Sequence, residues 1–381
     1  MQITVLGVGL VGGAVVRDLA QAPDFHITAV DLSQKRLRKL EKTPRVELVQ
    51  ADLKMPGRMA ALVGGCDLVI SAVPGFMGFE TVKQVVEAGK NVVDISFFGE
   101  DPFLLEGAAQ RMGVTAIVDC GVAPGLCNIV AGHVDSLLEE IDRYACYVGG
   151  LPVVREWPYE YKAVFSPADV LEEYTRPVRL VEYGREIVRP ALSEVERINF
   201  PGVGTLEAFN TDGLRTLRKT LNAPFMKEKT LRYPGHANLM RVFAESGFFS
   251  HTPIEINGQY LSPAALTSKL LFDKWKLEAG EADFTIMKIV LEGRKGEKRY
   301  RYTYTLRDDY DRETQTTSMA RTTGYTCAIA ARQLLSGRFA RMGICPPEYI
   351  GRTGSCYEDL MAEYAKRNIR LTETITELPC L

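Results

Sequence analysis

The stretch that decides the fold is MQITVLGVGLVGGAVVRDLA, residues 1–20. It combines a short run of β-branched residues, a glycine-rich turn and an amphipathic helical segment. Gly7, Gly9 and Gly12 fill a G-x-G-x-x-G pattern at the junction of strand and helix. In that setting the first glycine permits a tight turn, the second lets the backbone approach a pyrophosphate, and the third lets helix and strand pack closely. The stretch therefore predicts the start of a dinucleotide-binding domain.

The next apolar run, FHITAVDLS (25–33), predicts a second strand that ends in a carboxylate, Asp31. Its separation of about 20 residues from the glycines is the one at which an acidic side chain accepts hydrogen bonds from the adenine ribose. A carboxylate there repels a 2′-phosphate, which favours NAD over NADP. Lys35 and Arg36 follow closely and weaken that preference.

Further short apolar segments continue the pattern, and helical stretches separate them. Such segments are typical of strands buried on both faces of a parallel sheet. The first part of the chain, about 120 residues, therefore predicts an α/β fold with a doubly wound parallel sheet of the Rossmann kind. The segments are VELVQADL (46–53), CDLVISAVP (66–74), KNVVDIS (90–96) and VTAIVDCG (114–121).

The carboxyl ends of such strands form the ligand-binding edge of the sheet. We expect the cofactor to contact residues at these ends, although a plain turn would also explain Pro74 and the glycine after it. The expected contacts are Gly7, Val8, Gly9, Leu10, Val11 and Gly12 at the first turn, Asp31 at the ribose, Asp52 and Leu53 beside the adenine, and Ala72, Val73, Pro74, Gly121 and Val122 along the nicotinamide half.

Beyond residue 122 the alternation of strand and helix gives way to hairpins. DFTIMKIVLEG (283–293) and KRYRYTYTLRD (298–308) have the pattern of antiparallel strands joined by a short turn, as has RLVEYGREIVR (179–189). Two helical segments follow, TTGYTCAIAARQLLSG (322–337) and EDLMAEYAKRNI (358–369). This part predicts a second domain of the α+β class with an antiparallel sheet.

The length, composition and charge of the chain limit the classes of protein to which it can belong. The chain has 381 residues, of which 46% are hydrophobic, and a net charge of −2, which fits a globular protein of two domains. Because no basic excess supports binding to nucleic acid or to a membrane surface, we expect a small-molecule substrate. The apolar start lacks the basic residues of a signal peptide, and no run is long enough to span a bilayer. The eight cysteines and four histidines lack metal or disulfide spacing, so we expect a cytoplasmic protein without a metal site.

Five motifs carry a resemblance to a known family: the G-x-G-x-x-G start, SAVP (71–74), VDCGVAPGLCN (118–128), EYKAVFSPADVLEEY (160–174) and TLEAFNTDGLRTL (205–217). Together they resemble the saccharopine dehydrogenase family, and within it the short lysine 6-dehydrogenases. The resemblance implies a Rossmann domain of residues 1–122 and 320–381, and an inserted α+β substrate domain of residues 123–319. It also implies a C-terminal helix that returns to the Rossmann domain, and a homodimer built on the second sheet.

The implied activity is NAD-dependent oxidation of the lysine ε-amine to allysine, which cyclises to 1-piperideine-6-carboxylate, with release of ammonia and NADH. Longer saccharopine reductases carry an Arg-Gly turn after their Ser-Pro, whereas Ser166 and Pro167 are followed here by Ala168 and Asp169. The missing arginine argues against a substrate with several carboxylates. Two alternatives stay open: reductive condensation of an amine with an aldehyde using NAD(P)H, as in saccharopine or carboxynorspermidine formation, and an NAD-binding sensor or assembly protein without turnover.

Amine oxidation needs an unprotonated amine, so the site must desolvate the ammonium or provide a base. A second base must activate the water that hydrolyses the imine. Asp119 ends the last predicted strand of the first domain, and it either serves as one of these bases or caps the hinge that follows. The resemblance adds Lys162, as a general base or as a ligand of the substrate carboxylate; a solvent-facing lysine is the alternative. Cys120 could act as a nucleophile, but no histidine stands at a motif position to activate it, and a buried thiol is the commoner case.

The resemblance places the FNTDG turn (209–213) in the substrate pocket, where its polar side chains either contact the α-amino and α-carboxylate groups or cap a helix. Arg241 is the preferred carboxylate clamp, because a guanidinium matches carboxylate geometry, and Arg321 is its rival. The expected substrate contacts are Tyr161, Asn210, Thr211, Asp212, His236, Arg241 and Arg321.

Overall fold

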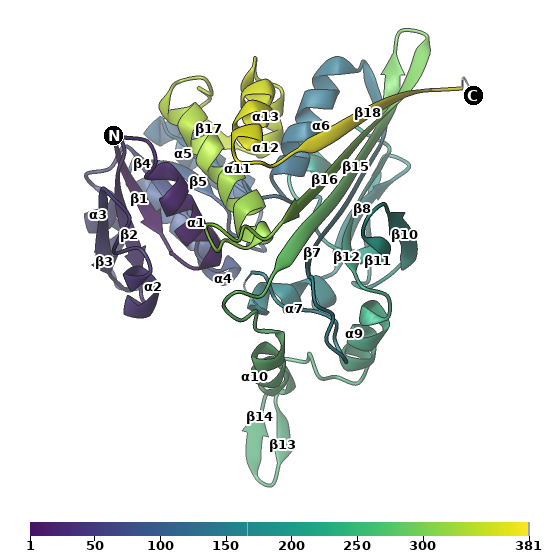
Figure 1. Cartoon of the computed structure of the whole chain (residues 1–381), viewed down its shortest axis with the longest axis horizontal. Helices are drawn as coiled ribbons and strands as arrows, with labels where there is room; N and C mark the ends of the chain where they lie inside the picture. Colours follow the sequence, from purple (N-terminus) through teal and green to yellow (C-terminus); the bar gives the residue numbers. More distant parts are fainter. Residues whose placement is uncertain (166, 380–381) are drawn as a thin grey trace. The chain divides into compact units, whose positions relative to one another are not determined.

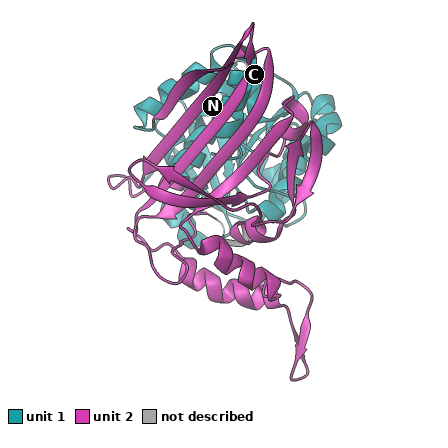
Figure 2. Cartoon of the chain, turned by 90° about the vertical axis from the view of Figure 1, so that its right-hand side faces the viewer, with its two compact units in different colours: residues 1–136, 320–369 teal, residues 137–319, 370–381 magenta. Residues whose placement is uncertain are grey.

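The computed structural model describes residues 1–165 and 167–379; Ser166, part of the Ser-Pro comparison, lies outside that part of the chain. The chain folds into two compact units (Figure 2). Unit 1 contains Met1–Ser136 and Ala320–Ile369, and unit 2 contains Leu137–Met319 and Arg370–Leu381. Among the described residues, no helix is both long and apolar enough to span a membrane.

Unit 1 is built on a sheet of seven strands in the order β17-β6-β5-β4-β1-β2-β3 (Figure 1). Neighbouring strands run parallel. The order changes direction at β1, whose neighbours β2 and β4 lead to opposite edges. The predicted doubly wound Rossmann sheet is therefore confirmed. Its strands are β1 (Gln2–Leu6), β2 (His26–Asp31), β3 (Val46–Gln50), β4 (Leu68–Ser71), β5 (Asn91–Asp94), β6 (Thr115–Ile117) and β17 (Gly343–Cys345).

Helices connect these strands in the βαβ pattern, and the last three helices of unit 1 come from the C-terminal part of the chain. The predicted C-terminal helix is α11, which begins at Ser318 rather than at Thr322. The helices are α1 (Leu10–Leu19), α2 (Gln34–Arg38), α3 (Arg58–Val63), α4 (Gly75–Glu87), the 3-10 helix η1 (Pro102–Leu105), α5 (Glu106–Met112), α6 (Leu126–Leu137), α11 (Ser318–Leu335), α12 (Pro347–Gly351) and α13 (Cys356–Lys366).

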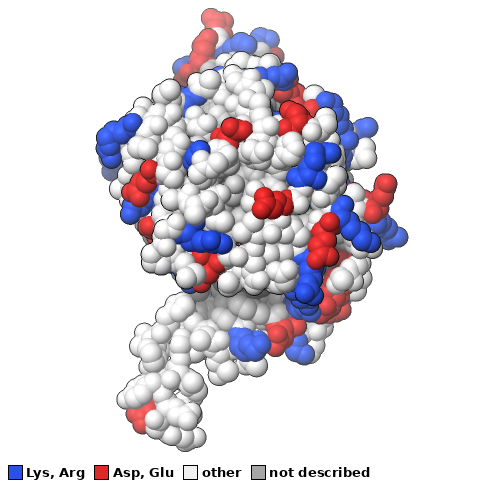
Figure 3. Space-filling view, turned by 90° about the vertical axis from the view of Figure 1, so that its left-hand side faces the viewer, with Lys and Arg blue, Asp and Glu red and all other residues white. Residues whose placement is uncertain are grey.

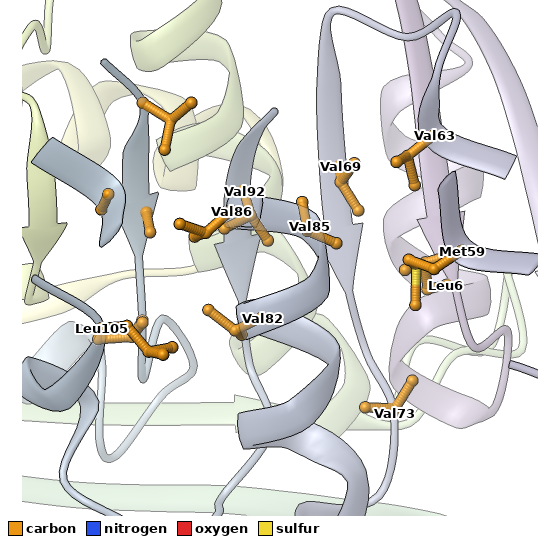
Figure 4. Packing of buried hydrophobic residues seen from close by; sticks show 14 of the residues in the cluster. Leu6, Met59, Val63, Val69, Val73, Val82, Val85, Val86, Val92 and Leu105 are labelled. Atoms are coloured by element: carbon orange, nitrogen blue, oxygen red, sulfur yellow. The ribbon is translucent and has the colours of Figure 1, made fainter. Parts of the chain in front are cut away.

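The core of unit 1 explains why its strands are nearly continuous apolar runs. Val82, Val85 and Val86 occupy one face of α4, at the i, i+3, i+4 spacing of a buried helical stripe. They belong to one cluster with Val69 of β4 and Val92 of β5, and all five are fully buried (Figure 4). Burial of a valine side chain is worth about 1.5–3 kcal/mol, so this layer contributes strongly to holding the helix on the sheet.

The sheet extends one strand further than the sequence predicts. VTAIVDCG (114–121) is predicted as the last strand, but β17 pairs with β6 in parallel, with Ile344 beside Ala116. The prediction is wrong on this point because β17 comes from a distant part of the chain, and its three residues do not lie within a longer apolar run. Strand β6 also has three residues, but it lies within the apolar segment 114–121.

Unit 2 contains a sheet of nine strands, whose main path is β10-β11-β12-β7-β15-β16-β18, with the hairpin β8–β9 attached through β12. The predicted hairpin of β15 and β16 is confirmed, since the two strands pair antiparallel along their whole length. The sheet is mixed rather than purely antiparallel, because β12 runs parallel to β7. The strands are β7 (Glu140–Pro152), β8 (Val178–Glu182), β9 (Arg185–Arg189), β10 (Glu196–Phe200), β11 (Gly204–Asn210), β12 (Phe225–Arg232), β15 (Asp283–Lys295), β16 (Lys298–Asp309) and β18 (Leu371–Leu378).

Four helices and a small separate hairpin complete unit 2. The hairpin projects beyond α10 (Figure 1). The elements are α7 (Pro167–Thr175), α8 (Leu217–Thr220), α9 (His236–Glu245), α10 (Pro263–Trp275), β13 (Ile254–Ile256) and β14 (Gln259–Leu261). On the face of the chain shown in Figure 3, acidic and basic side chains are interspersed.

The division into units differs from the predicted domains at two boundaries. Residues 123–136 belong to unit 1, where Asn128 of α6 donates a hydrogen bond to Glu348 of α12 at 3.0 Å. Residues 370–381 belong to unit 2, because β18 pairs antiparallel with β16. The boundary between residues 319 and 320 coincides with the predicted one.

Candidate active site

The glycine loop has the geometry that a pyrophosphate requires. A Cβ at Gly7, whose φ is +88°, would lie 2.5 Å from the Ala72 carbonyl oxygen, and a Cβ at Gly12 would lie 2.0 Å from the Gly7 carbonyl oxygen. Only glycine fits these two positions. A Cβ at Gly9 would meet nothing within 4 Å, and Gly9, the N-cap of α1, has no side chain to cap the first amides of the helix. The open backbone there fits the pyrophosphate of a dinucleotide.

Asp31 ends β2 beside this loop, and backbone hydrogen bonds fix its carboxylate. Oδ2 accepts the N–H of Val8 at 2.9 Å, and Oδ1 accepts the N–H of Ser33 at 2.7 Å. A carboxylate oxygen has a second lone pair for another donor. Asp31 is therefore held in position to accept hydrogen bonds from ribose hydroxyls.

The end of β4 lies at the point where the strand order changes direction. The N–H of Ala72 donates to the Leu6 carbonyl at 2.8 Å, which places the end of β4 directly beside the glycine loop. Val73 turns its side chain into the hydrophobic core, and Pro74 is the N-cap of α4. Ligands of doubly wound sheets bind in the crevice at such a point, and the contact of these three residues with the cofactor stays a prediction.

The predicted adenine contacts lie in the turn after β3. The Asp52 carboxylate accepts the N–H of Lys54 at 2.9 Å and so shapes its own turn. Leu53 packs against the hydrophobic core of unit 1. The ammonium of Lys54 lies 5.3 Å from the ring centroid of Phe76, which connects this turn to the first turn of α4.

Large apolar side chains are exposed at the same edge of the sheet, and most of them were not among the predicted contacts. Leu10 begins α1, Leu32 follows β2, Met55 follows β3, and Phe76, which is 74% exposed, lies in the first turn of α4. Exposed apolar residues gathered at one edge mark a binding surface. Their sequence signal is only a place within about five residues of a strand end, and neither composition nor periodicity could show Leu32, Met55 and Phe76.

Two buried carboxyl groups occupy the other half of the edge. Asp94 ends β5 and is fully buried, and Asp119 follows β6, the neighbour of β5 in the sheet. Ser96 donates its hydroxyl to Asp94 Oδ1 at 2.6 Å and its N–H to Oδ2 at 3.1 Å. Burial raises the pKa of Asp94 to about 7, the charge of Asp119 adds to the rise, and the hydrogen bond from Ser96 opposes it. Asp94 was missed by the sequence reasoning, because its only signal is an acidic residue at the end of an apolar strand.

Cys120 follows Asp119 and is inert. Burial raises the pKa of its thiol strongly, and the charges of Asp94 and Asp119 raise it further. A thiol in that state is not a nucleophile at neutral pH, which agrees with the interpretation of Cys120 as a buried packing residue. The loop beyond it is closed by the hydrogen bond from the Gly121 N–H to the Pro124 carbonyl, and the N–H of Cys127 donates to the Val122 carbonyl.

In unit 2, Tyr161 lies in an aromatic cluster rather than on a surface. Its ring centroid is 5.2 Å from that of His236 and 5.4 Å from that of Trp275. The guanidinium carbon of Arg232 lies 4.5 Å from the Tyr161 ring centroid, and Arg232 pairs with Glu173 at 2.7 Å. Arg232 is almost fully buried. It was not among the candidates, because a sequence alone does not show which carboxylate an arginine pairs with.

His236 is the centre of two hydrogen bonds in this cluster. Nε2 lies 2.9 Å from the Tyr174 hydroxyl, and Nδ1 lies 2.9 Å from the Tyr159 carbonyl. Burial, and next the charge of Arg232, lower the pKa of His236 to about 3. The ring is therefore neutral at physiological pH, donates from Nδ1 and accepts at Nε2, so both of its nitrogens are occupied within unit 2.

The FNTDG turn is held by hydrogen bonds within unit 2. Asp212 Oδ1 accepts both the backbone N–H and the Nε–H of Arg179 at 3.0 Å. Thr211 accepts a hydrogen bond from the Thr230 hydroxyl at 3.1 Å. Asp212 thus anchors a neighbouring strand through an ion pair, a role that its sequence position does not show.

Asn210 and Arg241 both donate hydrogen bonds to the short segment 192–193. The Asn210 amide donates to the Ser193 hydroxyl at 3.1 Å, and the Arg241 guanidinium donates to the Leu192 carbonyl at 3.0 Å. These two predicted substrate contacts therefore lie close together, and both position the loop at 192–193.

The last two candidates, Lys162 and Arg321, belong to different units and have different partners. The Lys162 ammonium lies 3.0 Å from Glu156 and 3.8 Å from Glu281, and its side chain remains partly accessible. Arg321 is buried on α11 in unit 1, where its guanidinium donates to the Arg367 carbonyl at 2.8 Å.

A doubly wound parallel sheet with an open glycine loop after its first strand and a carboxylate at the end of its second strand is typical of nicotinamide dinucleotide-dependent oxidoreductases. Two family models match the chain: the saccharopine dehydrogenase NADP binding domain over residues 3–117, and the saccharopine dehydrogenase C-terminal domain over residues 121–369. The chain belongs to the saccharopine dehydrogenase family.

Two curated relatives illustrate how far along the chain the similarity extends. The saccharopine dehydrogenase [NADP(+), L-glutamate-forming] of Schizosaccharomyces pombe is 24% identical over 98% of this chain and 99% of that protein. The mitochondrial alpha-aminoadipic semialdehyde synthase of Mus musculus is 26% identical over 65% of this chain. The match spans only 28% of the mouse protein.

Solved structures show the same fold. The saccharopine dehydrogenase (L-Glu forming) of Saccharomyces cerevisiae matches with a TM-score of 0.80 at 18% identity, covering 98% of this chain and 99% of that one. A homospermidine synthase of Legionella pneumophila in complex with NAD matches with a TM-score of 0.63 at 13% identity, covering 98% and 91%. At these identities the likeness concerns the fold alone.

Proposed function

We propose that this chain is an NAD-dependent L-lysine 6-dehydrogenase. In this reaction the ε-ammonium of lysine, NAD⁺ and water give allysine, NADH, ammonium and one proton, and allysine then cyclises to 1-piperideine-6-carboxylate. The observation that carries the proposal is the pair of buried carboxyl groups, Asp94 and Asp119, at the nicotinamide half of the sheet edge. A carboxyl group that titrates near neutral pH suits a reaction that releases a proton at that pH.

The roles of the residues follow from their positions. In this proposal Asp119 takes the ammonium proton, and Asp94, whose pKa burial raises to about 7, exchanges protons beside it. When bound, NAD accepts the hydride from the carbon that carries the nitrogen. Lys162 stays a predicted ligand of the substrate carboxylate, although its ammonium pairs with Glu156 and Glu281 within unit 2.

NAD is the proposed cofactor because Asp31 is fixed with both oxygens beside the glycine loop. A carboxylate there accepts the ribose hydroxyls of NAD and repels the 2′-phosphate of NADP. The proposal of lysine as substrate is supported by Ala168 and Asp169, which stand where longer saccharopine reductases have their Arg-Gly turn.

A second candidate function is the reductive condensation of an amine with an aldehyde. It is favoured by the names of the relatives, since the Schizosaccharomyces pombe protein is a saccharopine dehydrogenase. The same glycine loop and carboxyl pair would serve that direction, with the carboxyl group donating a proton instead of accepting one.

The experiment is an assay of the purified chain with NAD and a panel of amino acids and polyamines, followed by NADH absorbance. We expect lysine to give the highest rate, and the Asp119→Asn variant to lose it. Asp135→Asn is the matched control, because Asp135 pairs with Arg352 on the same unit and has no proposed catalytic role. NADPH consumption that requires both an aldehyde and an amine would favour the condensation instead, and NAD binding without turnover on any amine would favour a sensor.

A further inference from the structure

The loop that follows β6 begins with a strained residue. Asp119, the proposed base, is buried and has a φ of +54°, in the left-handed region that residues other than glycine rarely adopt. Such a conformation persists only where the surrounding structure holds the chain in place. On the side of the sheet, the N–H of Cys120 donates to the Asp94 carbonyl at 2.8 Å. The restraint on the other side has to come from the rest of the loop.

The rest of the loop folds back on itself. The Gly121 N–H donates to the Pro124 carbonyl at 3.0 Å, and the Leu126 N–H donates to the Gly121 carbonyl at 2.9 Å. Gly125 has a φ of +135°, and a Cβ there would lie 1.9 Å from the Gly121 carbonyl oxygen. The backbones of these two glycines are therefore in direct contact, so a group that fixes Gly125 also fixes Gly121, two residues after Asp119.

Gly125 is fixed by a side chain of α6. Its N–H donates to Asn128 Oδ1 at 3.1 Å, and Asn128 Nδ2 donates to Glu348 Oε2 of α12 at 3.0 Å. Asn128 and Glu348 are both fully buried. Because the carboxyl oxygen of Glu348 accepts from the nitrogen end of the Asn128 amide, the oxygen end faces Gly125.

Close contact between α6 and α12 makes Glu348 a firm anchor. A Cβ at Gly132 would lie 2.0 Å from the Glu348 carbonyl oxygen, and a Cβ at Gly351 would lie 1.9 Å from the Ile129 carbonyl oxygen. These two glycines let the backbones of the helices touch (Figure 1). Glu348 is therefore held in place relative to Asn128 by its own backbone.

We propose that Glu348 is a positioning residue of the candidate active site. Through Asn128 it holds the loop of residues 121–125, and this loop, together with the sheet, keeps Asp119 in its left-handed conformation. Loss of the anchor lets Asp119 relax to an ordinary conformation and moves its carboxylate away from the amine. This inference rests on the proposed function of Asp119, and it adds a residue of α12 that contacts neither the substrate nor the cofactor.

The test compares two substitutions of nearly equal size. Glu348→Gln keeps an oxygen that accepts from Asn128, whereas Glu348→Met removes it. We expect kcat for lysine oxidation to fall about tenfold to a hundredfold in Glu348→Met, because displacement of a reacting group by about 1 Å has an effect of that size. Glu348→Gln should keep kcat within about threefold, since a neutral hydrogen bond replaces a stronger one. KM for lysine should change less than kcat in both variants.

A second measurement needs neither lysine nor NAD. The Gly125 amide exchanges with solvent when its hydrogen bond to Asn128 opens, so hydrogen exchange of the chain alone reports on the anchor. We expect this exchange to be at least about tenfold faster in Glu348→Met and unchanged in Glu348→Gln. Asn128→Ala removes the same link from its other end and should reproduce the loss of kcat, so the test does not depend on one variant.

Gln333→Ala is the matched control for the loss of a buried hydrogen bond. Gln333 is buried in the same unit, and its amide donates to the Cys356 carbonyl at 2.7 Å, which ties α11 to α13 rather than to the loop. This variant should lower the melting temperature, but it should change neither kcat nor the exchange of the Gly125 amide.

Several outcomes would overturn the proposal. An unchanged kcat in Glu348→Met, or exchange at Gly125 equal to that of the wild type, would show that Glu348 does not hold the loop for catalysis. An equal loss of kcat in Gln333→Ala would reveal a general effect of stability. A further loss of kcat when Glu348→Met is added to Asn128→Ala would mean that Glu348 does not act through Asn128. If the wild type oxidises no amine, the proposed function itself fails, and exchange at Gly125 still decides whether Glu348 anchors the loop.

Discussion

Asp94 and Asp119 lie buried at neighbouring strand ends of the parallel sheet, and the charge of Asp119 adds to the burial that raises the pKa of Asp94 to about 7. Burial is the larger cause of this rise, and a neighbouring negative charge adds to it because it disfavours ionisation of Asp94. Near neutral pH the Asp94 carboxyl group can therefore release a proton and take it back. This is the property that the proposed amine oxidation requires.

Replacement of Asp119 by asparagine should remove the proton acceptor while keeping the size of the side chain. General base catalysis typically contributes 10²–10⁴-fold, so we expect kcat for lysine oxidation to fall by at least about a hundredfold. NADH binding, measured by fluorescence, should change far less. A variant that retains most of its activity would show that Asp119 only caps the turn after β6.

Replacement of Asp94 by asparagine should change how stability depends on pH. The folded pKa of about 7 lies above the ordinary value of 3.8, so the folded protein binds more protons between these values. The wild type therefore loses stability as pH rises from about 4 to about 7, by up to about 4 kcal/mol. We expect thermal unfolding to show that the stability of the variant, relative to that of the wild type, is higher at pH 8 than at pH 5. A constant difference between the two proteins would contradict the raised pKa.

The sequence was sufficient to predict most of the cofactor sheet, because β1, β4, β5 and β6 are largely buried and lie in nearly continuous apolar runs. Gly7, Gly12 and Asp31 could be singled out because their pattern depends on spacing along the chain, and their contacts with the cofactor stay predictions. The exception is β17, which lies far along the chain and outside any longer apolar run.

The site of unit 2 could not be predicted in the same way. Asp212 looks like a substrate ligand or a helix cap, yet it pairs with Arg179, which belongs to another strand. His236 looks like a pocket residue, yet both of its nitrogens have partners in the chain. Such roles depend on contacts between distant segments, which spacing does not show.

The buried histidine of unit 2 predicts sensitivity to acid. The folded pKa of His236, about 3, lies below the ordinary 6.5, so the folded state binds fewer protons between these values and loses stability as pH falls from about 6.5 to about 3. His236→Gln should be less stable than the wild type at pH 7, by about 1–3 kcal/mol for the lost buried hydrogen bonds. It should lose less stability than the wild type between pH 7 and pH 4. An equal loss of stability between pH 7 and pH 4 in the variant and the wild type would show that His236 does not titrate in this range.

Two adjacent glycines of α1 offer a matched pair for the cofactor loop. A Cβ at Gly12 would lie 2.0 Å from the Gly7 carbonyl oxygen, whereas the nearest atom to a Cβ at Gly13 is the end of the Arg17 side chain at 3.6 Å. Gly12→Ala should therefore displace the loop and weaken NADH binding at least about tenfold, an effect of about 1.4 kcal/mol. Gly13→Ala should keep the affinity and stabilise the helix by up to about 1 kcal/mol, since alanine is the better helix former. Because both changes add the same methyl group to the same helix, equal NADH affinities in the two variants would refute the role of the glycine loop in binding the pyrophosphate.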